Sequence, residues 1–109
     1  MRPIQIEATP ITEETFERQG WYKEDTPNDE DEFHYWTLTL PKNSRDPYAP
    51  ILISSPSNQK VRGLKKGEYV VEMHDYNGLG FCTSEEEIEV LYKVLTKKSI
   101  YDKWQFVSI

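Results

Sequence analysis

The sequence has little of what holds small secreted proteins together or anchors proteins in membranes. Its 109 residues include a single cysteine, Cys82, so no disulfide bond can form within the chain. No apolar run approaches the roughly 20 residues that a membrane-spanning helix needs. The N-terminal residues also lack the basic, apolar and small-residue order of a signal peptide. We therefore expect a soluble, cytoplasmic protein in a reducing environment, with no membrane association.

Residues that commonly carry catalysis or bind metals are scarce as well. The two histidines, His34 and His74, stand at no metal-ligand spacing from each other or from Cys82. The sequence contains no calcium-loop pattern, no phosphate-binding glycine loop and no nucleophile elbow. Cys82 precedes three glutamates, whose charge opposes thiolate formation, so burial in the core is its favoured role. We expect no metal, no cofactor and no enzymatic activity.

Aromatic side chains supply much of the apolar material that is present. They make up 13% of the chain, as three Trp, seven Tyr and four Phe. Each can bury on the order of 150 to 250 Å², which favours a folded domain over a disordered chain. A chain of this length buries roughly two thirds of its extended surface in one core. We therefore expect a single domain over residues 1–109.

The strongest local signal is a predicted amphipathic helix between Ser84 and about Lys98. Ser84 and Glu87 have the spacing of a capping box, in which each side chain accepts a hydrogen bond from the other residue's amide. Acids at 85–87 and lysines at the other end match the helix dipole. The predicted core-facing stripe consists of Ile88, Leu91, Tyr92 and Leu95. This helix is the element on which the rest of the domain is expected to pack.

A second, shorter helix is predicted from about Thr12 to Gln19. Thr12 is a good N-cap residue, and acidic residues follow it in the first turn. Gly20 stands where a helix needs a left-handed residue after its end, and Trp21 then lies where it can touch Phe16, as in a Schellman motif. Two turns are too few to be stable alone, so this helix must dock on a larger element.

The middle of the chain predicts strands without helices between them. An extended segment begins at Trp21 to Lys23, and turn-forming residues in the acidic stretch after it predict a hairpin. Ile4 and Ile6 suggest a short edge strand, and residues 99–109 fit either a helical extension or a strand. The fold class expected is α+β, with an antiparallel sheet of three to five strands and both helices mainly on one face. The three clearest strands are Phe33–Leu40, Ile51–Ser54 and Glu68–Asp75.

In Phe33–Leu40 the residues alternate between two faces. Trp36, Leu38 and Leu40 are expected to face the core, because they are the larger apolar set. Tyr35 belongs to the other face. The strand is therefore predicted to have one buried and one more exposed side.

The net charge of −6 opposes direct binding to nucleic acid, which depends on clustered lysine and arginine. The charge is unevenly spread: residues 24–32 hold six acids and no base, whereas 60–66 form a local basic cluster. Short charge runs of this kind usually mark solvated loops. They can also orient a protein partner.

Two segments resemble a known family. PITEETFERQGW at 10–21 and EIEVLYKVLTKKSI at 87–100 are similar to the ends of short uncharacterised proteins from prophages and other mobile elements of Bacteroides-group gut bacteria. In that family an apolar-Thr-Glu-Glu helix closes on Gly and an aromatic residue, and the last helix reads Leu-x-x-Leu-Tyr-x-x-Leu-Thr. The resemblance implies a bacterial or phage accessory protein. It supplies no catalytic residues.

Two functions are consistent with these observations. The favoured one is a noncatalytic module that binds an unidentified protein partner, since Trp and Tyr residues suit interface anchors. The alternative is an acidic decoy that imitates nucleic acid and occupies a host DNA-binding protein. The candidate partner-binding residues are Asp29, Glu30, Asp31, Glu32, Tyr35 and Trp104. The oligomeric state stays open.

Overall fold

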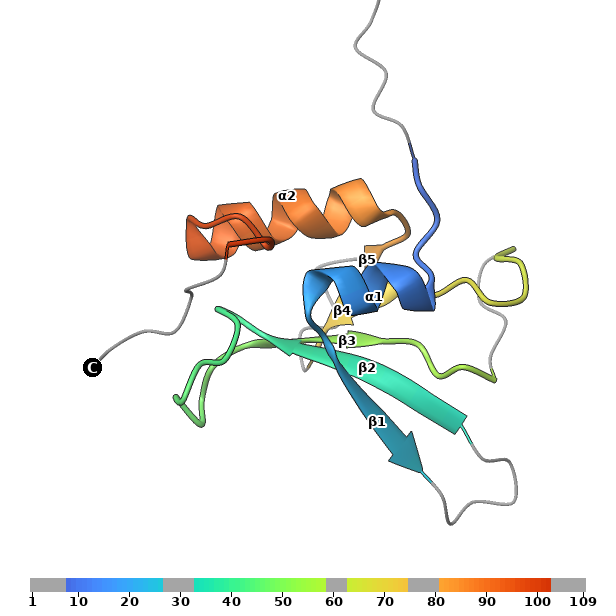
Figure 1. Cartoon of the computed structure of the whole chain (residues 1–109), viewed down its shortest axis with the longest axis horizontal. Helices are drawn as coiled ribbons and strands as arrows, with labels where there is room; N and C mark the ends of the chain where they lie inside the picture. Colours follow the sequence, from blue (N-terminus) through green and yellow to red (C-terminus); the bar gives the residue numbers. More distant parts are fainter. Residues whose placement is uncertain (1–7, 27–32, 59–62, 75–80, 103–109) are drawn as a thin grey trace, which may run out of the picture.

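The computed structural model describes residues 8–26, 33–58, 63–74 and 81–102. They form an α+β fold, as the sequence predicts (Figure 1). Along the chain, five strands follow one helix and precede the other. In chain order the elements are α1 (Glu13–Gln19), β1 (Tyr22–Thr26), β2 (Phe33–Thr39), β3 (Ile51–Ser54), β4 (Val71–Met73), β5 (Phe81–Cys82) and α2 (Glu85–Thr96).

The five strands form one antiparallel sheet in which every strand pairs with its neighbours in sequence, in the order β1-β2-β3-β4-β5. The predicted hairpin between the first two strands is confirmed, with Tyr22 opposite Thr37. Further across the sheet, Thr37 of β2 lies opposite Ile53 of β3, and Glu72 of β4 lies opposite Phe81 of β5. These residues all lie on one face of the sheet, because alternate residues share a face.

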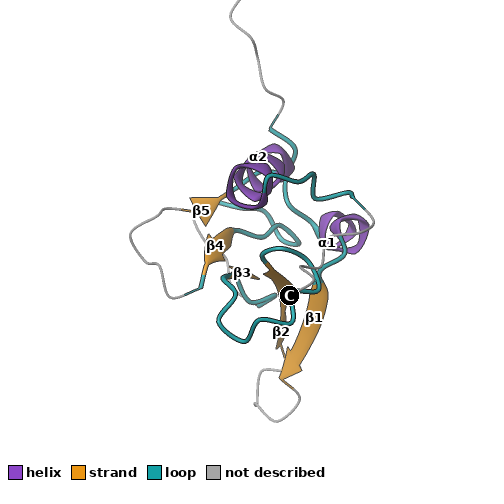
Figure 2. Ribbon diagram, turned by 90° about the vertical axis from the view of Figure 1, so that its left-hand side faces the viewer, coloured by secondary structure: helices purple, strands orange, loops and turns teal. Residues whose placement is uncertain are grey.

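Both helices cover the other face of the sheet (Figure 2). Trp36, Leu38 and Leu40 face them and are buried, which confirms the predicted core side of this strand. Leu52 and Val71 continue the same layer through β3 and β4 and are fully buried. The core therefore lies between one face of the sheet and the two helices.

The ends of α1 confirm the signals read in its sequence. Thr12 is the N-cap, and its amide donates to Thr15 Oγ1 at 3.1 Å. Gly20 adopts the left-handed conformation, with φ of 80°, which a glycine reaches without steric cost. The Trp21 amide then donates to the carbonyl of Phe16 at 2.9 Å, and the two rings pack with centroids 4.8 Å apart. The Schellman motif thus joins the end of α1 to the start of β1.

The start of α2 matches only half of the predicted capping box. The Glu87 amide donates to Ser84 Oγ at 3.2 Å, as expected. The Glu87 carboxylate, however, accepts from the Thr83 amide at 3.1 Å rather than from the Ser84 amide. The Ser84 hydroxyl donates to the same carboxylate at 3.1 Å. The reciprocal bond is therefore shifted by one residue and still stabilises the first turn.

The prediction that all four residues of the helical stripe face the core was wrong for one of them. Ile88 and Tyr92 are fully buried and Leu91 is partly buried, but Leu95 is 47% exposed. The helix ends at Thr96, the chain turns at Lys97 with φ of 62°, and Ile100 joins the core there instead. The core-facing stripe of α2 is therefore narrower and shorter than its apolar residues suggest.

The sheet differs from expectation in two places. Within the described residues, the strand predicted at Glu68–Asp75 is only Val71–Met73. Tyr69, two residues before it, pairs instead with Ile11 through a bridge in which its amide donates to the Ile11 carbonyl at 2.9 Å. β5 was not predicted, since two residues leave no periodic signal. The strand expected around Ile4 and Ile6 lies outside the described residues, as does most of 99–109, of which 99–102 belong to neither helix nor strand.

A buried carboxylate fixes α2 against α1. Glu85 is 6% exposed, and its Oε1 accepts hydrogen bonds from the Thr15 hydroxyl and the Arg18 guanidinium. A buried carboxylate is tolerated only when such partners satisfy it. The pair of helices is therefore held together by specific contacts at the N-terminal end of α2, which sets the position of that helix over β4 and β5.

None of the helices within the described ranges is long and apolar enough to cross a bilayer.

Candidate functional site

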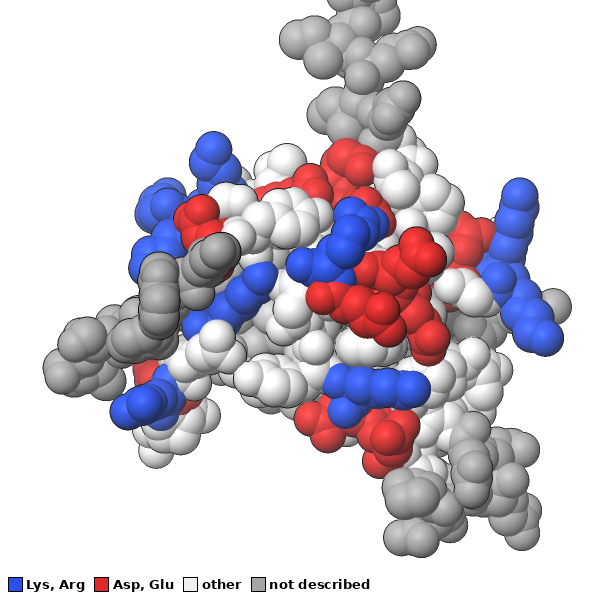
Figure 3. All heavy atoms as spheres, viewed as in Figure 1, with Lys and Arg blue, Asp and Glu red and all other residues white. Residues whose placement is uncertain are grey.

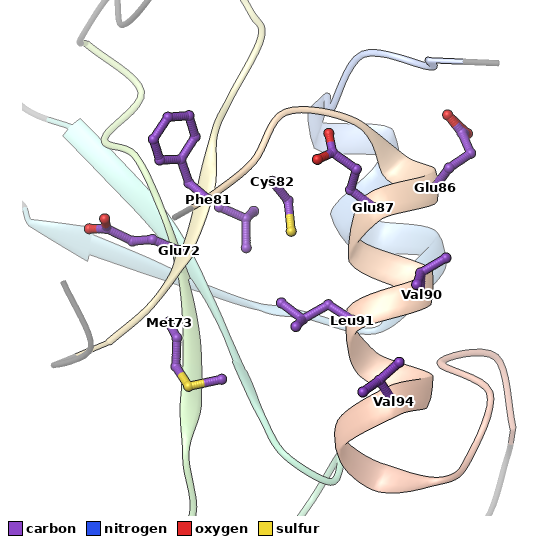
Figure 4. A pocket seen from close by; sticks show the side chains of 10 residues that line it. Glu72, Met73, Phe81, Cys82, Glu86, Glu87, Val90, Leu91 and Val94 are labelled. Carbon is purple, nitrogen blue, oxygen red and sulfur yellow. The ribbon is translucent and has the colours of Figure 1, made fainter. Parts of the chain in front are cut away.

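A groove of about 440 Å³ lies between α2 and the β4–β5 edge of the sheet (Figure 4). Its volume falls in the range of roughly 300 to 1,000 Å³ typical of binding pockets. Leu91 of α2 and Met73 of β4 extend into the space between the helix and the sheet. The apolar side chains around it are Val71, Met73, Phe81, Val90, Leu91 and Val94. The groove is therefore an apolar hollow at the edge of the fold.

The helical wall of the groove carries exposed valines. Val90 and Val94 are each 59% exposed and lie one turn apart, so they stand side by side along the helix. Glu86 lies one turn before Val90 on the same side. Isolated exposed valines are common, but these two adjoin a hollow that is itself apolar. Together they extend the apolar surface out of the groove and along α2.

The sheet wall is short because β5 is short. β5 is the edge strand, with Cys82 opposite Val71 and Phe81 opposite Glu72. Within the part of the sheet that the structure describes, Met73 has no partner on β5, and its side chain lines the groove.

Three carboxylates rim the groove, and no lysine, arginine or histidine is among its described lining residues. Glu72 of β4 is exposed and points away from α2 (Figure 4). Glu86 Oε1 accepts from the Thr9 amide at 2.6 Å, and Glu87 Oε1 accepts from Thr83. Burial acts to raise the pKa of Glu86, but the hydrogen bonds from Thr9 outweigh it and hold the pKa below its usual value. The rim is therefore negatively charged at neutral pH.

Cys82 lies in the groove lining and is buried there. It is 6% exposed, which confirms the predicted burial in the core. Burial, together with the nearby charge of Glu87, raises the pKa of its thiol to about 11. The thiolate is the reactive form, so this side chain is protonated and inert at neutral pH.

Of the partner-binding residues predicted from sequence, Tyr35 alone lies within the described part of the chain. It is half-buried on the face of the sheet that the helices leave uncovered, opposite Glu24 of β1. β3 separates its strand from β4, so it does not line the groove. Asp29, Glu30, Asp31, Glu32 and Trp104 lie outside the described residues.

Sequence reasoning missed the groove, although one signal for it was present. Val90 and Val94 are apolar at i and i+4 but fall outside the stripe that contains Ile88 and Tyr92. A helix with a second apolar line has more apolar surface than one face of a core can cover. The sequence did not show that the edge strand β5 lies beside this second apolar line of the helix.

A second cluster of polar side chains lies at the other end of the molecule. Glu13 Oε1 contacts His34 Nε2 and accepts from the Tyr69 hydroxyl at 3.2 Å, and that hydroxyl lies 3.2 Å from His34 Nε2. The three residues come from α1, β2 and the segment before β4. Burial acts to raise the pKa of Glu13, but the bonds from His34 and Tyr69 outweigh it and lower the pKa.

This cluster joins α1 to β2 and to the segment before β4. Burial, reinforced by the charge of Glu13, raises the pKa of Tyr69 to about 12, so its hydroxyl remains a hydrogen-bond donor. Tyr69 also packs edge-on against Phe16, with ring centroids 5.2 Å apart. No three His, Cys, Asp or Glu residues in the described ranges are grouped so that they could hold a metal ion.

Charge is distributed unevenly over the helical face of the molecule. Acidic side chains gather over the middle of this face, whereas lysines lie around the C-terminal end of α2 (Figure 3). Arg18 stands among the acids and is paired with Glu85. The acidic patch is therefore local and interrupted by positive charge.

No family model matches the chain, and no match was found among curated proteins or solved structures.

Proposed function

We propose that the chain is a noncatalytic protein-interaction module that binds a protein partner through the groove between α2 and the β4–β5 edge. The observation that carries this proposal is the pair of exposed valines, Val90 and Val94, beside an apolar hollow. Contiguous exposed apolar surface with a polar rim is typical of interaction sites. The carboxylate rim supplies the orienting charge.

A protein fits this site better than a small molecule does. The groove is open along α2, and its apolar surface continues onto the outer side of the helix, where Leu95 is also exposed. A small ligand is usually enclosed over most of its surface. An extended apolar surface of this form instead matches a helix or strand laid along it.

The biological setting that we propose follows from the resemblance to mobile-element proteins of Bacteroides-group bacteria. Such a chain would be a cytoplasmic accessory protein of a phage or a related element, and its partner a protein of the host or of the element. A noncatalytic role is consistent with the inert thiol of Cys82 and with the packing role of the Glu13–His34–Tyr69 cluster.

The test is capture of partners by three forms of the tagged protein from lysate of a Bacteroides-group bacterium. The forms are the wild type, the double variant Val90→Glu with Val94→Glu, and the control Tyr48→Glu, at a 91% exposed position in a loop. The proposal expects a protein captured by the wild type and the control but not by the double variant. Equal capture by all three forms, or capture by none, would contradict it.

The alternative function is an acidic decoy that imitates nucleic acid. The acidic patch in Figure 3 favours it, and Glu14 and Glu17 of α1 are exposed. Replacing Asp29, Glu30, Asp31 and Glu32 with Asn or Gln separates the two proposals. A decoy then loses its partner, and its binding weakens steeply with salt. Binding through an apolar groove persists.

A further inference from the structure

We infer that the occupant of the groove is a second copy of this chain, bound with the two α2 helices antiparallel about a two-fold axis. The inference rests on the proposed function, because it requires that the groove docks protein. It adds the identity of the partner and the direction in which the partner lies.

The apolar residues of α2 suit such a pairing. Val90 and Val94 lie one turn apart on the exposed side of α2, at the level along the helix where Tyr92 points into the core on the opposite side. In an antiparallel pair with its axis near Tyr92, Val90 of each copy meets Val94 of the second copy. Both valines are 59% exposed, so each has surface to bury. Such a contact also covers the open side of the groove that they line.

The charges on either side of the valines are complementary in the same arrangement. The first turn of α2 is acidic, at Glu85, Glu86 and Glu87, whereas Lys93 lies in its last turn and Lys97 and Lys98 follow the end of the helix. Figure 3 shows lysines around the C-terminal end of α2 and acidic side chains towards its N-terminal end. Antiparallel packing therefore places the acidic first turn of one copy near the lysines at the C-terminal end of the other copy's helix, twice. It also opposes the two helix dipoles, which is the favourable direction.

A parallel pairing would place acid beside acid and lysine beside lysine. Because each chain carries a net charge of −6, association needs local charge matching to offset the general repulsion. An antiparallel two-fold contact uses the same surface on both copies and closes on itself, so it yields a dimer and not a filament. The second copy is therefore the occupant whose charge order fits this surface.

The test uses charge exchange between the two ends of α2. Sedimentation velocity over a concentration series should show wild-type protein passing from 12.9 kDa monomer to dimer. Glu86→Lys alone and Lys98→Glu alone should each weaken the dimer by about tenfold, because each turns two attractions into repulsions. An equimolar mixture of the two variants should restore dimer formation, since the reversed charges then meet opposite ones.

Matched controls separate this effect from changes in net charge or in folding. Glu17→Lys and Lys66→Glu change the charge equally at exposed positions away from α2 and should leave the dimer unchanged. Glu86→Gln keeps an acceptor for the Thr9 amide and should weaken the dimer less than Glu86→Lys does. Circular dichroism melts should show all variants folded.

A wild-type protein that remains monomeric at every concentration overturns the inference, as does a mixture of variants that fails to recover the dimer. A second result also overturns it: the dimer is unaffected by either charge variant but disappears when the chain is ended at Asp102. That result would assign the groove to residues 103–109. If the wild type is monomeric while a different protein is captured only when Val90 and Val94 are intact, the inference fails and the proposed function stands.

Discussion

The two ends of the sheet are covered in different ways by similar helices. At the β1–β2 end, Phe16 of α1 is fully buried, and its ring packs against those of Trp21, Trp36 and Tyr69 at centroid distances of 4.8, 5.2 and 5.2 Å. At the β4–β5 end, α2 leaves a hollow lined by smaller side chains and exposes Val90. Large aromatic side chains close the first end, whereas the second remains open.

The residues that stabilise the fold and the surface proposed to bind a partner therefore lie in different parts of this small domain. The aromatic end stabilises the fold through apolar burial and the Glu13 hydrogen bonds. The groove end leaves apolar surface exposed, which lowers the stability of the folded chain only a little. Substitutions at the first end should therefore change the free energy of unfolding. Substitutions at the second should change binding.

The largest effect is expected from Phe16→Ala. Removing this fully buried ring leaves a cavity among three aromatic neighbours, which should lower the free energy of unfolding by about 3–5 kcal/mol. Urea denaturation followed by tryptophan fluorescence measures the change. A loss below about 1 kcal/mol, the ordinary size for a surface substitution, would show that the aromatic end is not the stabilising one.

A smaller loss is expected from Glu85→Ala. The substitution leaves the buried Thr15 hydroxyl without its acceptor and Arg18 without its ion pair, which should cost about 1–3 kcal/mol. Glu14→Ala, at an exposed acid of α1, is the matched control and should change little. Equal stability of the two variants in thermal melts would remove Glu85 as the link between the helices.

A pH effect is expected from Glu13. Hydrogen bonds from His34 and Tyr69 outweigh burial and hold its folded-state pKa below its ordinary value of 4.5. Its contribution to stability is therefore present above that value and is lost as the pH falls through the lower, folded-state pKa. Denaturation midpoints of the wild type should fall more steeply with acid than those of Glu13→Gln. Parallel pH profiles would contradict the prediction.

The smallest effect on stability is expected from Val90→Thr with Val94→Thr. Both positions are 59% exposed, so the free energy of unfolding should change by less than about 0.5 kcal/mol for each substitution. Binding should weaken, because the new hydroxyls must be desolvated at the interface. Thermal melts and the capture experiment on the same samples measure the two properties. A large loss of stability with unchanged capture would reverse the roles of the two ends.

The sequence predicted the elements whose signals are local. The Thr12 cap, Gly20 and Trp21 predicted both ends of α1, and alternation in Phe33–Leu40 predicted which side of β2 is buried. Neither prediction needed knowledge of distant contacts. The α+β class followed because no helix interrupts the run of strands.

The features that were missed depend on contacts between distant residues. β5 has two residues and exists because it pairs with β4, and Tyr69 leaves the expected strand because it pairs with Ile11. Leu95 has the spacing of a core residue, but the turn at Lys97 brings Ile100 into the core instead. The groove arises from these same long-range arrangements, so no local pattern located it.

The central claim, that partners bind at the groove, is tested most directly by methyl NMR of the folded protein as a partner is added. The partner is either the chain itself at rising concentration or the protein captured from lysate. The account predicts shifts of the Val90 and Val94 methyl signals, with those of Ile51 and Ile53 on the uncovered face of the sheet unchanged. Shifts confined to Ile51 and Ile53 would contradict it and place binding on that face, beside Tyr35.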